Sequence, residues 1–253
     1  MMLHPPMPAS RIARAYWTEA RFEMIRMLRA PAFLFPTLVL PVGLFLLLGV
    51  AIFRNIPDPK IAIGMFTGFA TFAMIGPGMF SFGIALAQER HQGILTLKRA
   101  LPMPPAAYLL AKMLMALTFS AVVMTALIAV AIAADRLPGV PPSQIARLAV
   151  VGILGTLPFC ALGLLIGTLA SGTSAPAFVN LIYFPMIYLS GLFFPLPGFL
   201  MRIAPVWPAY HLNRLAMDVV GIVDGRPVVH VLVLTSVMLG CTAFAVRRLS
   251  RVG

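Results

Sequence analysis

Six long apolar segments constrain the fold of this chain more than any other feature of its sequence. A helix needs about 20 largely apolar residues to cross a bilayer. Six segments reach that length, at residues 31–53, 61–87, 107–134, 145–170, 174–195 and 227–246. Hydrophobic residues make up 60% and charged residues 10% of the 253 residues, whereas soluble domains carry about 45–50% and about 25%. The sequence therefore predicts an all-α integral membrane protein, with one six-span domain over residues 31–253, and excludes a soluble enzyme.

Basic residues lie between the apolar segments and set the expected orientation. The net charge is +12, and most of the basic residues flank the two ends of the chain and the loop after the second segment. The positive-inside rule then places both termini in the cytoplasm. Charges in these positions argue against nucleic-acid binding, although the net charge alone would suggest it. We expect no cleavable signal peptide, because the first apolar run begins only after residue 30.

Residues 10–29 show the pattern of an amphipathic helix within the cytoplasmic N-terminus, residues 1–30. Apolar residues recur at helical spacing, and arginines lie mostly on the opposite face. A basic helix with Tyr16 and Trp17 on its apolar face suits the headgroup region of the inner leaflet. The helix is either a simple topology anchor or also a docking face for a cytoplasmic partner. That docking face would comprise Glu19, Phe22, Glu23 and Ile25.

The loop after the second segment, about residues 88–106, is the most informative stretch. Gly93 can interrupt the second helix, residues 94–100 can form a short helix, and the prolines at 102, 104 and 105 end that helix. A short helix between two spans can transmit force from a partner that grips it. The full pattern reads Glu89-x3-Gly93-x-Leu95-x5-Leu101-Pro102-x-Pro104-x3-Tyr108-x3-Lys112. A second block reads Ser190-Gly191-Leu192-Phe193-Phe194-Pro195-Leu196-x2-Phe199-Leu200-x2-Ile203-Ala204-Pro205-x2-Pro208-x-Tyr210.

Together, the two blocks resemble the ATP-binding-cassette type-two permeases, the six-span membrane subunits of exporters for drugs, lipids and surface polysaccharides. The resemblance implies a pore of two permease copies, most simply a homodimer, and two separate ATPase subunits that grip the coupling helix in the loop at 88–106. The implied ATPase-coupling residues are Glu89, Arg90, Gly93, Leu95, Leu97, Lys98, Arg99, Ser171 and Thr173. For Lys98 and Arg99, a plain role as positive-inside anchors stays open.

The chain lacks the groups that would let it catalyse a reaction by itself. There is no G-x-x-x-x-G-K-[ST] phosphate loop, so we expect ATP and Mg to bind the partner ATPase and no cofactor to bind this chain. The four histidines have no partner at metal-ligand spacing, and we expect no metal site. We expect His211 to be a hydrogen-bonded surface residue, with a pH-sensitive contact in the outer loop as the alternative. No serine and histidine pair suggests a hydrolase, and acidic residues are absent from the middle of the segments, which disfavours ion-coupled transport.

The segment between the fifth and sixth apolar segments, about residues 196–226, is too long for a simple turn and too interrupted by prolines to span. The resemblance implies a re-entrant outer hairpin here, and a surface amphipathic loop is the alternative. The candidate outer-gate residues are Phe194, Pro195, Phe199, Trp207 and Tyr210.

Methionine and phenylalanine side chains give the spans flexible apolar walls that suit an amphipathic substrate. The candidate substrate path comprises Phe72, Met74, Met79, Met124, Phe178, Asn180, Tyr183 and Met186, with ordinary helix packing as the alternative for each. The motifs Gly64-x3-Gly68 and Gly163-x3-Gly167 permit close helix approach, although the expectation of a dimer comes mainly from the resemblance. We expect an ATP-driven exporter of a drug, lipid or glycan-lipid in the bacterial inner membrane, or alternatively a non-transporting anchor or regulatory subunit.

Overall fold

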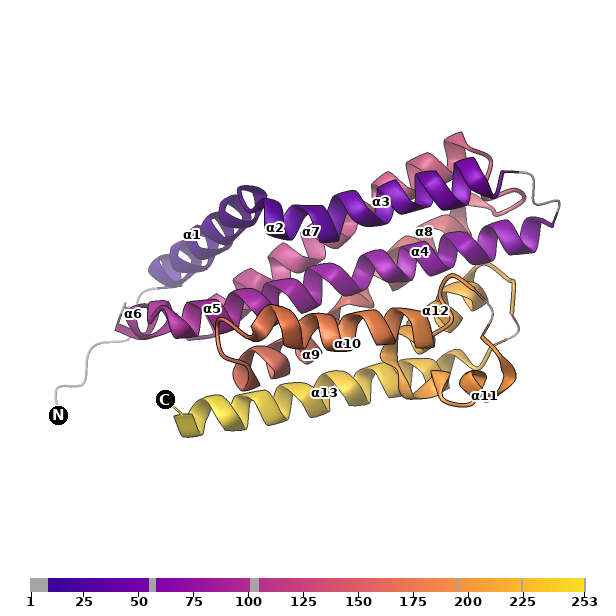
Figure 1. The fold of residues 1–253 in the computed structure, drawn as a ribbon. Helices are drawn as coiled ribbons and strands as arrows, with labels where there is room; N and C mark the ends of the chain where they lie inside the picture. Colours follow the sequence, from indigo (N-terminus) through magenta and orange to yellow (C-terminus); the bar gives the residue numbers. More distant parts are fainter. Residues whose placement is uncertain (1–8, 55–57, 101–104, 195, 224, 253) are drawn as a thin grey trace.

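The computed structural model describes residues 9–54, 58–100, 105–194, 196–223 and 225–252, and every regular element in these ranges is a helix (Figure 1). In chain order they are α1 (Ala9–Leu28), α2 (Pro31–Leu34), the π-helix η1 (Phe35–Val39), α3 (Leu40–Leu44), the π-helix η2 (Phe45–Ile52), α4 (Pro59–Met79), the π-helix η3 (Phe80–Ala85), α5 (Leu86–His91), α6 (Ile94–Ala100), α7 (Pro105–Ala133), α8 (Pro142–Leu154), α9 (Thr156–Leu169), α10 (Ala175–Leu189), α11 (Gly198–Met201), the 3-10 helix η4 (Ala204–Val206), α12 (Pro208–Val219) and α13 (Pro227–Val252).

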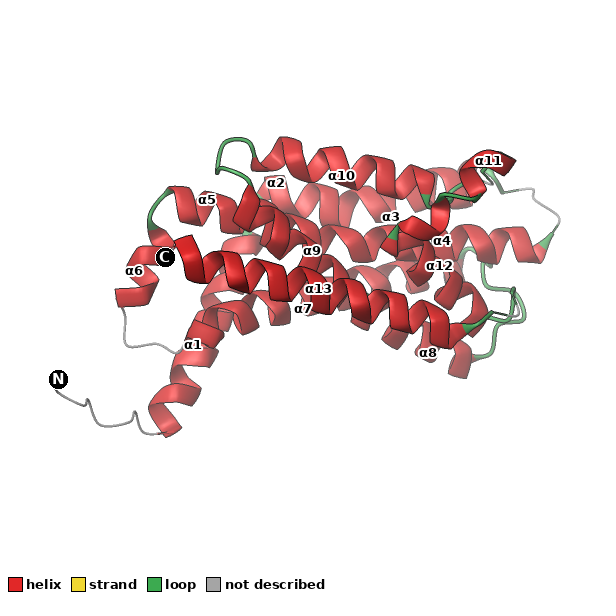
Figure 2. Ribbon diagram, turned by 90° about the horizontal axis from the view of Figure 1, so that it is seen from below, coloured by secondary structure: helices red, strands yellow, loops and turns green. Residues whose placement is uncertain are grey.

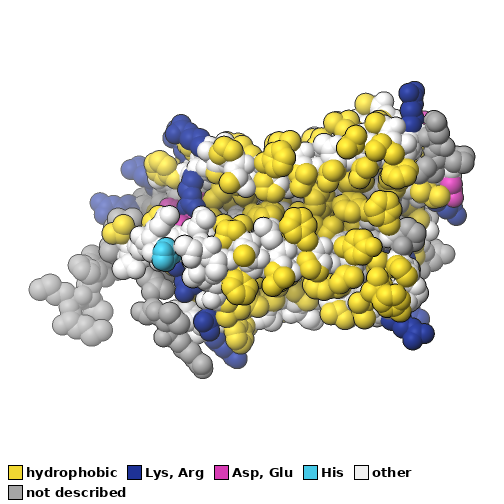
Figure 3. All heavy atoms as spheres, in the orientation of Figure 1, with side chains coloured by type: hydrophobic (Ala, Val, Ile, Leu, Met, Phe, Trp, Pro, Cys, Tyr) yellow, Lys and Arg dark blue, Asp and Glu magenta, His cyan; other side chains and the backbone are white. Residues whose placement is uncertain are grey.

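The long helices lie side by side in one elongated bundle with two distinct ends (Figure 1). We call the end that carries α1, α6 and the end of α13 the terminal end, and the end that carries α11 and α12 the distal end. Lys and Arg side chains gather at both ends, and hydrophobic side chains cover the length between them (Figure 3). This distribution is the one that a bilayer requires, because charged groups stay in water and apolar groups face lipid.

Five of the six predicted spans are confirmed as helices long and apolar enough to cross a membrane, within the described residues. They are Pro31–Ile52, Pro59–His91, Ala107–Ala133, Pro142–Leu169 and Pro227–Leu249. The predicted fifth segment, 174–195, is a helix over only Ala175–Leu189. Its 15 residues reach about 22 Å, less than the hydrocarbon thickness of about 30 Å. The six-span count therefore stays a prediction.

Proline explains where the spans change their backbone pattern. Pro158 has no N–H to donate to Leu154, four residues earlier, so the fourth span breaks at Gly155 into α8 and α9. In the second span, the turn after Pro77 widens into η3, and the Ser81 hydroxyl donates a hydrogen bond to the Pro77 carbonyl at 2.6 Å. Such side-chain hydrogen bonds satisfy backbone groups that lipid cannot.

The second span forms the centre of the bundle. In its apolar core 94% of the residues are buried, against 11% in the last span, α13. On one side, α4 and η3 pack against α9, and α9 in turn packs against α13 (Figure 2). The second span is therefore enclosed by protein, and α13 presents most of its surface outward.

Glycines bring the second span and α9 into backbone contact. A Cβ atom on Gly163 would lie 2.8 Å from the carbonyl oxygen of Gly78, and one on Gly78 would lie 2.6 Å from the amide nitrogen of Cys160. A Cβ atom on Gly167 would overlap the carbonyl oxygen of Phe82. The Gly163-x3-Gly167 motif thus serves packing within this chain, which is a structural alternative to the dimer contact that such motifs also support.

We predict that Gly163→Ala destabilises the protein, because the added methyl group would meet backbone atoms that cannot move aside. The expected loss is about 1–3 kcal/mol, the usual effect of overpacking a core, and it is measured as a lower thermal unfolding midpoint in nanodiscs. Gly240→Ala is the matched control, since nothing lies within 4 Å of a Cβ atom at that helical position. Equal midpoints for both variants would contradict the close α4–α9 contact.

Candidate functional site

A cluster of charged side chains lies buried at the terminal end, where α1, α5 and α7 meet. Glu89 of α5 accepts hydrogen bonds from the Lys112 ammonium at 2.9 Å, from the Tyr108 hydroxyl at 2.5 Å and from the Arg26 guanidinium. Lys112 also donates to Glu23 of α1 at 2.5 Å. We call Glu23, Arg26, Glu89, Tyr108 and Lys112 the charge cluster.

The charge cluster is both enclosed and balanced. Lys112 is 0% exposed, Glu89 1% and Glu23 3%, while Arg26 reaches partly into solvent. Two cations face two carboxylates, so the formal charges cancel. A buried ion of this kind is tolerated only when it is paired and hydrogen-bonded, because it has lost its hydration. Burial lowers the pKa of Arg26, but the Glu89 and Glu23 carboxylates outweigh it and hold that pKa above its ordinary value.

The charge cluster joins the loop after the second span to two other helices. Glu89 lies four positions before Gly93, whose φ of +73° is readily adopted by glycine, and α6 follows directly. The neighbouring Arg90 donates to the carbonyl of Gly167 at 2.7 Å, and Arg248 donates to the carbonyl of Thr168 at 3.2 Å. These carbonyls belong to the last turn of α9, which has no helical partners for them. A displacement of α5 would therefore reach α1, α7 and α9.

The structure divides the predicted ATPase-coupling residues into buried and exposed groups. Glu89 is enclosed and Arg90 is engaged with α9, so neither offers a free surface charge. Leu97 of α6 is 68% exposed, and Leu95 is partly buried. Lys98 and Arg99 belong to α6, and their side chains lie outside the described residues.

The turn that contains Ser171 and Thr173 lies next to the end of α5. A Cβ atom on Gly172 would lie 2.6 Å from the Cβ atom of His91. Ser171 and Thr173 are exposed, and the Ser171 hydroxyl lies 2.7 Å from that of Ser174. The two predicted contact regions, α6 and this turn, thus adjoin each other at the terminal end.

A cavity of about 590 Å³ opens between the first span, η3 and α10. Phe33, Phe80 and Phe184 give it apolar walls, and Asn180 and the Tyr183 side chain add polar groups. The Tyr183 hydroxyl is buried and has no hydrogen-bond partner among the described residues. Arg26 also lines this cavity, so the charge cluster borders it directly.

The cavity brings together only part of the predicted substrate path. Asn180 and Tyr183 line it. Phe72 packs on Tyr183, with ring centroids 6.0 Å apart, and Met186 is buried in the same core. Met74 instead contacts the Thr156 hydroxyl at 3.7 Å, and Met124 lies against Gly152. Met79 is buried beside Gly163, and Phe178 is exposed. Met74, Met79 and Met124 therefore lie in the packing between helices, outside the cavity lining.

Four of the five predicted outer-gate residues are described, and these four lie at the distal end but not in one place. Phe194 and Tyr210 line a second pocket there. Trp207 precedes α12 and packs against the core, whereas Phe199 of α11 is exposed. Pro195 lies outside the described residues. The segment predicted as a hairpin contains three short helices, α11, η4 and α12.

Two features of the site were not predicted from the sequence. Glu23 was assigned to an exposed docking face, and this was wrong because its carboxylate lies beneath α1 on Lys112. Its spacing of three residues from Arg26, and that of four residues between Tyr108 and Lys112, could have signalled helix faces that meet. His211 was expected at the surface, but it is buried, with its Nδ1 2.9 Å from Nδ1 of His230 and its Nε2 2.8 Å from the carbonyl of Pro205.

Comparison with known proteins agrees with this architecture. Residues 14–220 match the sequence model of the family described as "ABC-2 type transporter". The chain is also 25% identical over 202 residues to the Bacillus subtilis (strain 168) protein named "Putative transport permease YvfS". That alignment covers 78% of this chain and 82% of the relative.

We predict that Lys112→Met strongly destabilises the protein, since it leaves the Glu23 and Glu89 carboxylates buried with too little positive charge. The expected loss is about 3–5 kcal/mol, the range seen when one partner of a buried ion pair is removed. Thermal unfolding in nanodiscs measures it. Lys60→Met removes the same charge from an exposed position at the start of α4 and should leave the midpoint unchanged. The double variant Lys112→Met with Glu23→Gln restores neutrality and should recover part of the loss.

Proposed function

The chain belongs to the ABC-2 type transporter family, and from that premise we propose that it is the membrane permease subunit of an ATP-driven exporter. Its cargo is a hydrophobic or amphipathic molecule such as a drug, a lipid or a glycan-lipid. The observation that carries this proposal is the position of the charge cluster. It borders the cavity through Arg26 and holds the start of the α6 loop through Glu89.

The mechanism follows from these connections. An ATPase subunit grips α6 and the adjoining turn at 171–174, and Leu97 offers it an exposed apolar contact. Closure of two ATPase subunits on ATP and Mg pushes α6, and the α5–α6 segment moves with it. Because the charge cluster ties α5 to α1 and α7, the cavity wall moves together with the loop. Inward access then closes, and the distal end opens.

The chemistry of the cavity favours an amphipathic cargo. Its aromatic walls remove apolar surface from water, while Asn180 and Tyr183 can hydrogen-bond a polar group. Arg26 adds a guanidinium at one edge, whose hydrogen-bond donors favour acceptor oxygens on the head of the cargo. A small, highly charged solute would find too few polar partners there.

The orientation and assembly belong to the same proposal. The basic terminal end faces the cytoplasm of a bacterium, as the positive-inside rule requires, and α1 lies along the inner leaflet. The segment between α10 and α13 forms the outer gate, with its short helices dipping into the outer leaflet as a re-entrant hairpin. Two copies of the chain pair to enclose the path, and each copy binds one ATPase subunit. The chain itself carries no catalytic site in this scheme.

One experiment tests the proposal as a whole. The chain is purified in nanodiscs with and without the cassette protein encoded beside it, and ATP hydrolysis is measured. Turnover that needs both proteins and changes with added lipids or drugs supports an exporter. A stable complex that never hydrolyses ATP would instead identify a non-transporting anchor.

We predict that Lys98→Glu with Arg99→Glu uncouples the transporter. The charge reversal places acidic groups on α6 where the ATPase docks, so cargo-stimulated hydrolysis should fall at least tenfold while the chain remains folded. Arg147→Glu with Arg202→Glu makes the same change on exposed distal residues and should retain coupling. Unchanged export by the α6 variant would remove this helix from the coupling contact.

We predict that Tyr183→Phe weakens cargo binding without loss of stability. The hydroxyl has no partner among the described residues, so its removal should leave the unfolding midpoint unchanged or higher. One lost hydrogen bond to cargo corresponds to a rise in KM of about 2–13-fold. Transport assays in proteoliposomes measure that rise. An unchanged KM would place the cargo elsewhere in the bundle.

A further inference from the structure

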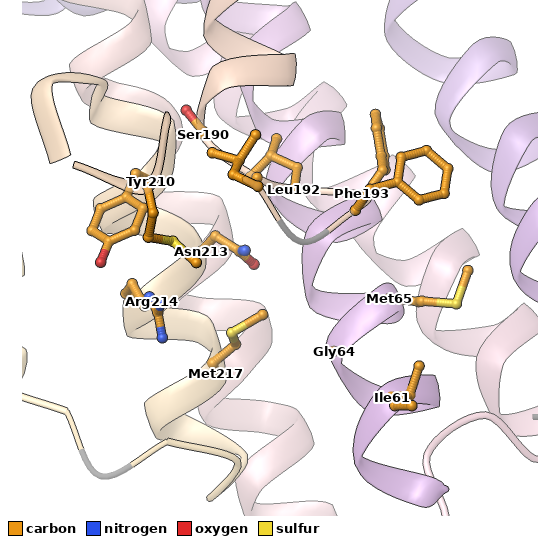
Figure 4. Close-up of a pocket in the computed structure, with 14 residues that line it drawn as sticks. Ile61, Gly64, Met65, Ser190, Leu192, Phe193, Tyr210, Asn213, Arg214 and Met217 are labelled. Carbon is orange, nitrogen blue, oxygen red and sulfur yellow. The ribbon is translucent and has the colours of Figure 1, made fainter. Parts of the chain in front are cut away.

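A pocket of about 280 Å³ lies at the distal end, apart from the cavity described above (Figure 4). It forms where the loop after α10 passes between α4 and α12. Gly68 of α4 permits this passage, because a Cβ atom there would overlap the carbonyl oxygen of Leu192. Gly191 starts the loop with a φ of +65°. The two glycines thus let the loop backbone turn at Gly191 and pass close to α4 at Gly68.

Two buried polar side chains line this pocket without a partner. The Ser190 hydroxyl and the Oδ1 atom of Asn213 make no hydrogen bond to any described residue, although Ser190 is only 3% exposed and Asn213 only 4%. Figure 4 shows the Asn213 amide extending from α12 toward α4. A buried polar group without a partner is unfavourable because it has lost its hydrogen bonds to water, so two of them in one pocket indicate a ligand that completes their hydrogen bonds.

The remaining polar groups narrow the chemistry of that ligand. Arg214 lines the pocket, with its guanidinium 5.2 Å from the centre of the Tyr210 ring. Its positive charge disfavours an ammonium headgroup, and a guanidinium donates hydrogen bonds but accepts none. Asn213 Oδ1 needs a donor. A hydroxyl group meets both demands, because it donates to Asn213 and accepts from Arg214. It can also accept a hydrogen bond, so it still fits if the oxygen and nitrogen of the Asn213 amide exchange places.

The rest of the pocket is apolar. Ile61 and Met65 of α4 and Met217 of α12 also line it. The volume is near the lower limit of ligand pockets, about 300–1,000 Å³, and therefore fits a single sugar or glycerol unit rather than a whole lipid. An apolar wall beside a polar floor suits the point at which such a headgroup joins an acyl chain.

We propose that this distal pocket binds the hydroxyl-bearing headgroup of an amphiphile, through Ser190, Asn213 and Arg214. The amphiphile is either the cargo as it leaves or a resident lipid of the outer leaflet, since both present the same chemistry. Only the assignment to cargo rests on the proposed function. The binding itself is independent of ATP and of the ATPase.

The test uses the full chain in phosphatidylcholine nanodiscs, whose own headgroup carries no hydroxyl. Monoglucosyl-diacylglycerol or phosphatidylglycerol is added in increasing mole fraction, and the thermal unfolding midpoint is recorded. Binding to the folded state raises the midpoint. We expect a rise with at least one of these lipids, and no rise with free glucose or free glycerol at the same nominal concentration.

Variants locate the binding. Ser190→Ala and Asn213→Leu should each require about tenfold more of the lipid for the same rise, because each removes one hydrogen bond. Thr71→Val is the matched control, since Thr71 is also a buried hydroxyl without a partner among the described residues but does not line this pocket. It should respond like the unchanged chain.

Three results would overturn the proposal: no rise with either lipid, an equal rise with the free headgroup compounds, or an undiminished rise in both pocket variants. A second measurement then separates the two sources of the headgroup. If the same lipid stimulates ATP hydrolysis by the complex and Asn213→Leu removes the stimulation, the bound amphiphile is cargo. Binding without stimulation identifies a resident lipid and leaves the pocket assignment intact.

Discussion

The need to neutralise ions away from water governs the terminal end of this protein. Lys112 is fully enclosed, and its charge is tolerated only because Glu23 and Glu89 lie against it from two other helices. The same requirement fixes the relative position of α1, α5 and α7, since a shift of any one helix would break a pair. An ion cluster of this kind adds little net stability over apolar packing, but it allows few alternative arrangements. Its structural value is therefore the rigid connection of the loop to the spans.

Backbone hydrogen bonding imposes a second constraint, which the structure meets with side chains. Lipid offers no partner for a free carbonyl, and the bundle contains breaks at Gly155 and widened turns at η1, η2 and η3. Arg90 and Arg248 donate to the last carbonyls of α9, so two of the basic residues counted for orientation also have specific partners. A positive charge at the end of a span can thus contribute to topology and cap a helix at once.

The sequence was sufficient for the features that depend on local chemistry. Apolar length predicted five spans to within a few residues, and Gly93 followed by prolines predicted the short helix in the loop after the second span. It was insufficient where distant residues meet. Glu23 and Lys112 are 89 residues apart, and the local spacing of polar residues marks a polar face on each helix without stating which face it meets. Met74 and Met124 were assigned to a path because of their flexibility, but the direction in which each side chain points is set by helix packing. Asn180 and Tyr183 belonged to the same predicted path, and both line the cavity.

In the exporter that we propose, the difference between the two hollow regions of the protein gives transport a direction. The cavity near the terminal end is large, and aromatic side chains form much of its wall, so it can take the apolar part of a cargo. The distal pocket is about half as large and carries two unpartnered polar groups and Arg214, so it can take a polar headgroup but not a whole lipid. An amphiphile that moves from the cavity to the distal pocket exchanges burial of its apolar chain for hydrogen bonds to its headgroup. The apolar chain of the amphiphile can then enter the outer leaflet directly, and the distal pocket has no need to enclose it. A headgroup site of small volume is therefore sufficient for release.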